Sequence, residues 1–292
     1  MNYPEQVIIK TANGVFHLKI TTEINRDNQI IESYFIGLGS RNNKCVQLSV
    51  PSIESTIKTG TLSWVKAEDD CSLEQYIKKG LAHHMVLLGI TLARDINPSL
   101  EKIYLDDMST FTCDLPDNKE YKIQMKAFHI AFHGATWYEY YFGAKLVNKY
   151  DIYCNLKANL YEGDKKPQYF KFNNAKLQEE LEPLYKNSQT WAEFFERIDK
   201  KYGKKKCGIV YPWLLLALYV IFDGENMFEN VKWYIDLNNN TKIISVPFKS
   251  YEFKQTAGKT RKKSRYTYTP YFFYLIDIDE VNKMNYAKFL RA

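Results

Sequence analysis

The chain of 292 residues combines 45% hydrophobic residues with 15% aromatic residues and a formal net charge of +6. This composition excludes a chain that is disordered throughout, because disordered chains lack the aromatic residues needed to bury a core. The net charge is too small to indicate a nucleic-acid-binding protein by itself. The length predicts two lobes, which we expect as domains over 1–154 and 155–292.

The cysteines are odd in number and widely spaced, and none of them forms a Cys-x-x-Cys pair. This pattern predicts free thiols in a reducing compartment and no zinc site. The N-terminus has no basic region followed by an apolar one, so we expect no signal peptide and a cytoplasmic location. The five cysteines are Cys45, Cys71, Cys113, Cys154 and Cys207.

One uncharged apolar run, from Cys207 to Phe222, is a candidate membrane span. It is shorter than the roughly 20 residues that a helix needs to cross a bilayer, and it contains Pro212. Proline fits the first turn of a helix, where its missing N–H costs nothing. The run therefore predicts a buried core helix over 212–222, and we expect no membrane partner.

The N-terminal third has the alternation and turn residues of β-strands. Asn13-Gly14 favours a tight turn, so residues 6–20 are predicted to form a β-hairpin. The segment Gly37–Ser40 is interpreted as a turn, with a nucleotide-binding loop as the weaker alternative. Further strands are predicted at 31–37, 44–50 and 60–66.

A long helix is predicted next, from Leu73 to Asn97-Pro98, because apolar residues recur at helical spacing. A buried strand follows at 102–107 and ends in two acids, and an aromatic-rich helix is predicted over 127–142. The fold class expected from this order is α/β, or α+β, with helices flanking a mixed sheet.

Four motifs in this region resemble the central motifs of the GNAT superfamily of acetyl-CoA-dependent N-acetyltransferases. The resemblance implies a GNAT-like lobe that binds acetyl-CoA by its pyrophosphate at a helix start. The pattern is degenerate, since Ile77 stands where the family has Gln or Arg. The motifs are Gly80–Leu88, Ala93-Arg94, Ile103–Asp107 and Trp137–Ala144.

By this resemblance, Gly80, Ala82 and His83 would hold the cofactor. Tyr138 would be the acid that protonates the departing thiolate, and Glu68 or Asp69 would be the base. The implied reaction is direct attack of a substrate amine on the thioester. A non-catalytic relative of the family fits the same motifs.

A basic segment over 254–265, followed by aromatic residues, supports an alternative function. Basic side chains beside aromatic ones can neutralise phosphates and stack the bases of RNA or single-stranded DNA. The segment also fits a solvated loop between strands predicted at 242–253 and 266–278. The candidate residues are Lys259, Arg261, Lys262, Lys263, Arg265, Tyr266 and Tyr268.

His129 and His133 lie four residues apart on the predicted helix, close enough to share a metal ion. No third ligand is apparent, so packing or capping roles are favoured and no metal is expected. Further elements are predicted in the C-terminal half: helices at 174–186 and 189–202 and a strand at 231–237.

The abundance of Asn, Lys, Ile and Tyr resembles the composition of orphan proteins of large cytoplasmic DNA viruses. The sequence therefore predicts a GNAT-like acyl-CoA-binding protein located in the host cytoplasm or the virion. The alternative is a non-enzymatic protein that binds RNA, single-stranded nucleic acid or a viral assembly partner through the basic segment.

Overall fold

The structure is a computed structural model that describes residues 6–11, 14–24, 31–39, 44–65, 82–114, 120–227, 231–239, 249–252 and 272–275. The contacts divide the chain into unit 1, which comprises Met1–Leu105 and Asp236–Ala292, and unit 2, Asp106–Ile235. These units do not coincide with the domains predicted over 1–154 and 155–292, because the chain returns to unit 1 after residue 235. The predicted mixed α/β fold class is confirmed.

Unit 1 is built on a mixed sheet whose strands follow the order β11-β12-β1-β2-β3-β4-β5-β6. Strands β1 to β5 pair antiparallel in chain order, whereas β5–β6 and β1–β12 are parallel pairs. The bounds are β1 Gln6–Thr11, β2 Gly14–Ile24, β3 Ile31–Gly39, β4 Lys44–Pro51, β5 Thr59–Val65, β6 Lys102–Asp106, β11 Lys249–Glu252 and β12 Phe272–Leu275.

The hairpin predicted over 6–20 is confirmed as the antiparallel pair β1–β2. Gly14 pairs with Thr11 and is the first residue of β2, while Asn13 lies outside the described residues. The turn predicted at Gly37–Ser40 is wrong for its first part. The pairs Gly37–Gln47 and Leu38–Val46 continue the β3–β4 ladder, and the register shifts only at the next residue. Hydrogen bonding to the neighbouring strand therefore overrides the turn propensity of the glycine.

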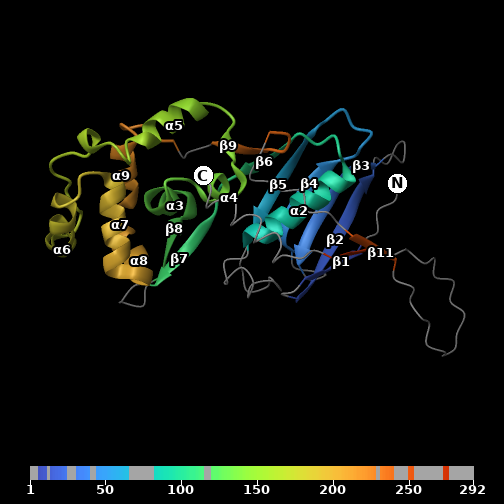
Figure 1. The fold of residues 1–292 in the computed structure, drawn as a ribbon, viewed down its shortest axis with the longest axis horizontal. Coiled ribbons are helices and arrows are strands. Elements are labelled where there is room, and N and C mark those ends of the chain that lie inside the picture. The colour runs from blue at the N-terminus through green and yellow to red at the C-terminus, as the bar shows by residue number, and fades with distance from the viewer. Residues whose placement is uncertain are drawn as a thin grey trace, which may run out of the picture. The chain divides into compact units, whose positions relative to one another are not determined.

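Helix α2 (Ala82–Ile96) packs on strands β3 and β4 of this sheet (Figure 1). Most of its side chains are buried, which explains its nearly continuous apolar sequence. Its predicted end is confirmed. Beyond that end, the Asn97 side-chain amide donates to the carbonyl oxygens of Pro51 and Ser52 at 3.1 and 3.3 Å. The predicted start at Leu73 lies outside the described residues.

Unit 2 is mainly helical and contains a two-stranded hairpin, β7–β8 (Figure 1). The sequence analysis missed this hairpin. The bounds are β7 Thr110–Asp114, β8 Glu120–Gln124, α3 Met125–His133, α4 Trp137–Phe142, β9 Lys145–Leu146, α5 Tyr150–Ala158, α6 Ala175–Lys186, α7 Trp191–Tyr202, α8 Lys206–Val210, α9 Leu214–Ile221 and β10 Lys232–Asp236.

Aromatic side chains form the core of unit 2. Phe195 of α7 stacks on Trp213 at a ring separation of 5.9 Å, and Phe172 meets Trp213 edge-on at 5.1 Å. Trp191 and Phe194 of the same helix are fully buried beside them. Such contacts stabilise a core beyond the area that they bury. The helix predicted over 189–202 is confirmed as α7.

The single helix predicted over 127–142 is wrong, because the chain breaks between α3 and α4. Gly134 ends α3 in the left-handed conformation, with φ of 67°. Thr136 then begins α4, and its hydroxyl accepts the Glu139 N–H at 3.2 Å. A left-handed glycine followed by a capping threonine is the usual signal for one helix ending and another beginning.

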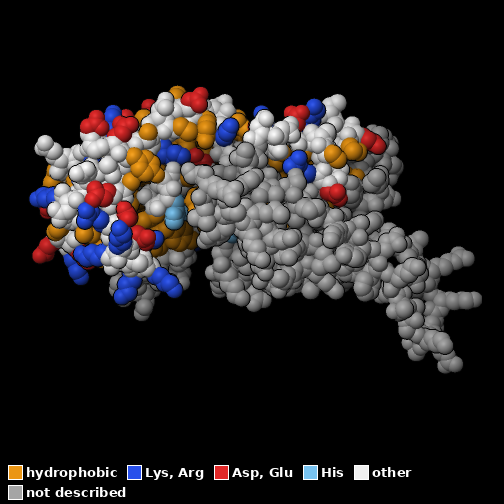
Figure 2. Space-filling view, viewed as in Figure 1, with side chains coloured by type: hydrophobic (Ala, Val, Ile, Leu, Met, Phe, Trp, Pro, Cys, Tyr) orange, Lys and Arg blue, Asp and Glu red, His pale blue; other side chains and the backbone are white. Residues whose placement is uncertain are grey.

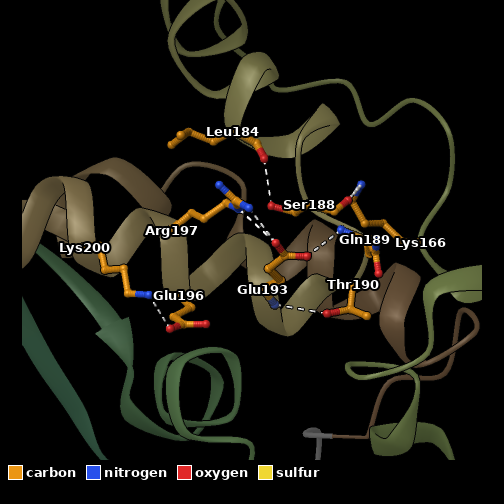
Figure 3. Close-up of polar contacts among 9 residues, drawn as sticks. All are labelled: Lys166, Leu184, Ser188, Gln189, Thr190, Glu193, Glu196, Arg197 and Lys200. Atoms are coloured by element: carbon orange, nitrogen blue, oxygen red, sulfur yellow. Dashed lines mark hydrogen bonds and ion pairs between the residues drawn. The ribbon is translucent and has the colours of Figure 1, made fainter.

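The start of α7 is also capped by a threonine (Figure 3). The Thr190 hydroxyl accepts the Glu193 N–H at 3.1 Å, and the Glu193 carboxylate accepts the Gln189 N–H at 2.7 Å. Arg197, one turn further on, holds the other carboxylate oxygen at 2.6 Å. The Thr190 bond satisfies an N–H group that the helix itself leaves unpaired, and the Glu193 bond ties the preceding residue to the first turn.

The prediction that the cysteines are free thiols is wrong. Cys113 of β7 and Cys207 of α8 form a disulfide, with Cα atoms 5.7 Å apart. Cys45 is also disulfide-bonded, to a partner outside the described residues. Cys154 is a free thiol. Sequence spacing did not reveal the first pair, because its cysteines are 94 residues apart and meet only in the fold.

The predicted apolar helix at 212–222 is present as α9, which begins two residues after Pro212. Only one of its faces is buried: Leu215, Leu216 and Tyr219 are each about half exposed. No helix among the described residues is long and apolar enough to cross a membrane.

Candidate functional site

The predicted cofactor site lies at the start of α2, which connects the parallel strands β5 and β6. The end of α2 is near the start of β5, since the Glu101 N–H donates to the Lys58 carbonyl at 2.8 Å. A helix of 15 residues is about 22 Å long, close to the length of a seven-residue strand. The start of α2 therefore lies toward the carboxyl end of β5, the edge where open α/β sheets bind ligands.

The first turn of α2 suits an anion. It contains no acidic residue, and Ala82 and His83 in this turn are half-buried. The first N–H groups of a helix carry a partial positive charge that favours phosphate. Three other predicted site residues, Gly80, Glu68 and Asp69, lie outside the described residues.

Tyr138, the predicted acid, is the second residue of α4 in unit 2, whereas Ala82 and His83 belong to unit 1. Its side chain is only 6% exposed and lies edge-on to Trp137 at 4.8 Å. Burial, together with the nearby Asp107 carboxylate, raises the pKa of Tyr138 well above its usual range. The phenol therefore stays protonated at physiological pH, although its burial restricts access to it.

A buried polar cluster around Asp107 lies near Tyr138 and was not recognised as a site from the sequence. The Ser109 hydroxyl and N–H both donate to Asp107 Oδ1, and Lys126 Nζ donates to the Asp107 carbonyl oxygen at 3.1 Å. Asp107 Oδ2 is buried and has no hydrogen-bond partner among the described residues. The available signal was the pair of acids, Asp106 and Asp107, that ends a buried strand.

Burial pushes both ionisable groups of this cluster toward their neutral forms. It raises the pKa of Asp107, against the opposing effects of the Ser109 hydrogen bonds and the Lys126 charge. It lowers the pKa of Lys126, against the opposing effect of Asp107. Buried ionisable groups with perturbed pKa values are common at functional sites, so this cluster is a candidate site.

Replacing Asp107 with asparagine should remove a pH dependence of stability. Because the folded-state pKa of Asp107 is raised, the folded state binds more protons than the unfolded state as pH rises through the range between the two pKa values. The free energy of unfolding of the wild type should therefore fall as pH rises over that range. D107N should lack this part of the fall and should be at least as stable as the wild type at about pH 7. Urea denaturation at a series of pH values measures the difference.

Asp106→Asn is the matched control, because the neighbouring Asp106 side chain is exposed. It should follow the wild-type pH profile. A D107N protein that is much less stable than D106N at neutral pH would contradict a neutral buried carboxyl at position 107.

The predicted nucleic-acid-binding residues, Lys259 to Tyr268, lie outside the described residues. Within the described part of the chain, no group of three or more His, Cys, Asp or Glu side chains could hold a metal ion.

Comparisons with protein-family models, with curated proteins and with solved structures found no match to this chain.

Proposed function

We propose that unit 1 binds a phosphate-bearing ligand of the acyl-CoA class at the start of α2. One observation carries the proposal: α2 crosses between the adjacent parallel strands β5 and β6, and its first turn has no acidic residue. In such a crossover the helix start and the strand ends form an anion-binding edge. The GNAT-like motifs Gly80–Leu88 and Ile103–Asp107 occupy this crossover.

The reaction proposed for this ligand is N-acetyl transfer. A substrate amine would attack the thioester carbonyl and lose a proton to Glu68 or Asp69, and the departing thiolate would take a proton from Tyr138. The resemblance to the GNAT superfamily suggests these roles. Burial raises the pKa of Tyr138, so its phenol holds the proton that this role needs.

Thermal melting of the purified protein with acetyl-CoA, CoA and adenosine 3′,5′-bisphosphate tests the binding proposal. A ligand at about 100 times its dissociation constant should stabilise the folded state by about 2.7 kcal/mol, a shift of a few degrees. All three ligands should raise the melting temperature if the protein recognises their phosphates. The absence of a shift with any of them at saturating concentration would contradict the proposal.

Ala82→Asp places a carboxylate in the first turn of α2, where it should repel phosphate. An acidic residue in a first turn favours the helix by about 0.3–1 kcal/mol, so weaker ligand binding would not reflect unfolding. We expect A82D to lose the acetyl-CoA shift. Ala175→Asp at the exposed start of α6 is the matched control and should keep the shift.

The second candidate function is binding of RNA or single-stranded DNA by the basic segment 254–265. The observation favouring it is the run of Lys259, Arg261, Lys262, Lys263 and Arg265 directly before two tyrosines. Binding of this kind should weaken steeply with salt and with neutralisation of these residues. A melting shift with a short RNA alone, lost at higher salt, would support this function and leave the sheet of unit 1 as a scaffold.

The location proposed with either function is the cytoplasm or a virion. The disulfide between Cys113 and Cys207 favours the virion, because cytosolic proteins seldom keep structural disulfides whereas virion surfaces do. A viral assembly partner remains part of the second candidate.

A further inference from the structure

His129 and His133 lie side by side on one face of α3. They are four residues apart on the helix, and their ring centroids are 4.4 Å apart. Tyr140 of α4 lies beside both rings, at 6.0 and 6.1 Å. The structure thus brings two imidazoles of α3 into direct contact.

The two rings differ in burial, and together they connect the interior with the surface. His129 is half-buried, and its Nδ1 is fully buried with no hydrogen-bond partner among the described residues. His133 is exposed. On the face shown in Figure 2, histidine side chains reach the surface next to hydrophobic ones. An exchangeable ligand could therefore approach from the His133 side.

The protonation state of both imidazoles suits a metal ligand. Burial lowers the pKa of His129 to about 4, with His133 and Lys206 adding to the effect. Burial and Lys206 lower the pKa of His133, against the opposing effect of Asp199. Both rings are therefore neutral at pH 7 and carry a lone pair.

The Ala135 backbone supports the ring of His129 in the way that metal-binding histidines are commonly supported. It forms a hydrogen bond with the imidazole, while Nδ1 has no partner in the described part of the chain. A backbone carbonyl that accepts one ring N–H fixes the tautomer and leaves the other nitrogen available for a metal.

We propose that His129 and His133 chelate one divalent transition metal ion of the Zn²⁺, Ni²⁺ or Cu²⁺ type, with water in the remaining coordination positions. Imidazole nitrogen suits these ions, whereas Mg²⁺ and Ca²⁺ require oxygen ligands. The positive charge of Lys206 opposes a cation, but Asp199 pairs with its Nζ at 2.5 Å. With two protein ligands and open positions, the site would bind exogenous ligands and exchange metal readily.

Calorimetric titration of the full-length, tag-free chain with ZnCl₂ and NiCl₂ at neutral pH tests the proposal. We expect one equivalent to bind to the wild type, and His133→Ala to weaken binding by roughly 100-fold, since the second ligand of a chelate acts at high effective concentration. His133 is exposed, so H133A should fold normally. Electron paramagnetic resonance with Cu²⁺ should show coupling to two imidazole nitrogens in the wild type and to one in H133A.

His17→Gln in β2 and Cys154→Ser are the controls for a remote histidine and for the free thiol. Both should bind metal as the wild type does. Any of three results would overturn the proposal: equal metal binding by H133A and the wild type, loss of the bound metal ion in C154S, or no metal binding by the wild type. A normal melting curve of metal-free H133A would show that its lost binding does not reflect misfolding.

Discussion

Replacing Cys113 and Cys207 with serine is expected to lower the free energy of unfolding by about 2–5 kcal/mol. The disulfide joins β7 to α8 across 94 residues, so it excludes many extended conformations from the unfolded chain. Its loss should also weaken the contact of the β7–β8 hairpin with α8, beside which Tyr121 of β8 and Tyr211, the residue after α8, lie 4.6 Å apart. Urea denaturation of the oxidised proteins measures the change in unfolding free energy.

Cys154→Ser is the control for this experiment, because Cys154 is a free thiol. It should change stability by much less than the double variant. Reduction of the wild type is a weaker test, since it also breaks the disulfide of Cys45. Mass mapping of the non-reduced protein that finds Cys113 and Cys207 as free thiols would contradict the crosslink itself.

Local signals in the sequence were sufficient for most of the sheet and for several helices. Asn13-Gly14 favoured a β-hairpin, and β1 and β2 pair antiparallel with Gly14 as the first residue of β2. Asn97-Pro98 predicted the end of α2, which the Asn97 bonds to the neighbouring loop reinforce. Such signals succeed because the conformational preference of two or three residues agrees with the tertiary structure.

The errors arose where the apolar pattern alone did not distinguish two structures. The apolar pattern continues from α3 into α4 because both helices bury a face. The local break signal, Gly134 followed by Thr136 and Glu139 at capping-box spacing, was overlooked. The β7–β8 hairpin was not predicted; its strands are only five residues long each and bear polar residues. Where the chain bends after α3, and whether residues 110–124 pair as a hairpin, both depend on contacts with other elements.

The polar cluster in unit 2 could be predicted only in part. Two acids at the end of the strand 102–107 were recognised, but not that Asp107 is buried while Asp106 is exposed. The burial of Lys126 at the start of α3 depends on how that helix packs, and lysine is rarely buried. A sequence pattern reveals residue types, whereas the pKa shifts follow from burial in the fold.

Glu139→Ala should lower the free energy of unfolding by about 3–5 kcal/mol, the cost of removing one partner of a buried ion pair. The Glu139 carboxylate accepts the Thr136 N–H at 2.8 Å, the Tyr153 hydroxyl at 2.5 Å and Lys157 Nζ at 2.8 Å. Alanine would leave a mostly buried ammonium and a buried phenol without this acceptor, and would also remove half of the capping box of α4.

Two further substitutions separate the contribution of charge from that of shape, and urea denaturation measures all three variants. Glu139→Gln keeps an oxygen for the Thr136 N–H but loses the charge opposite Lys157, so it should be destabilised less than E139A. Glu196→Ala breaks an exposed pair with Lys200 and should cost no more than about 1 kcal/mol (Figure 3). Equal losses in E139A and E196A would show that Glu139 is solvated, contrary to the buried network that joins α4 to α5.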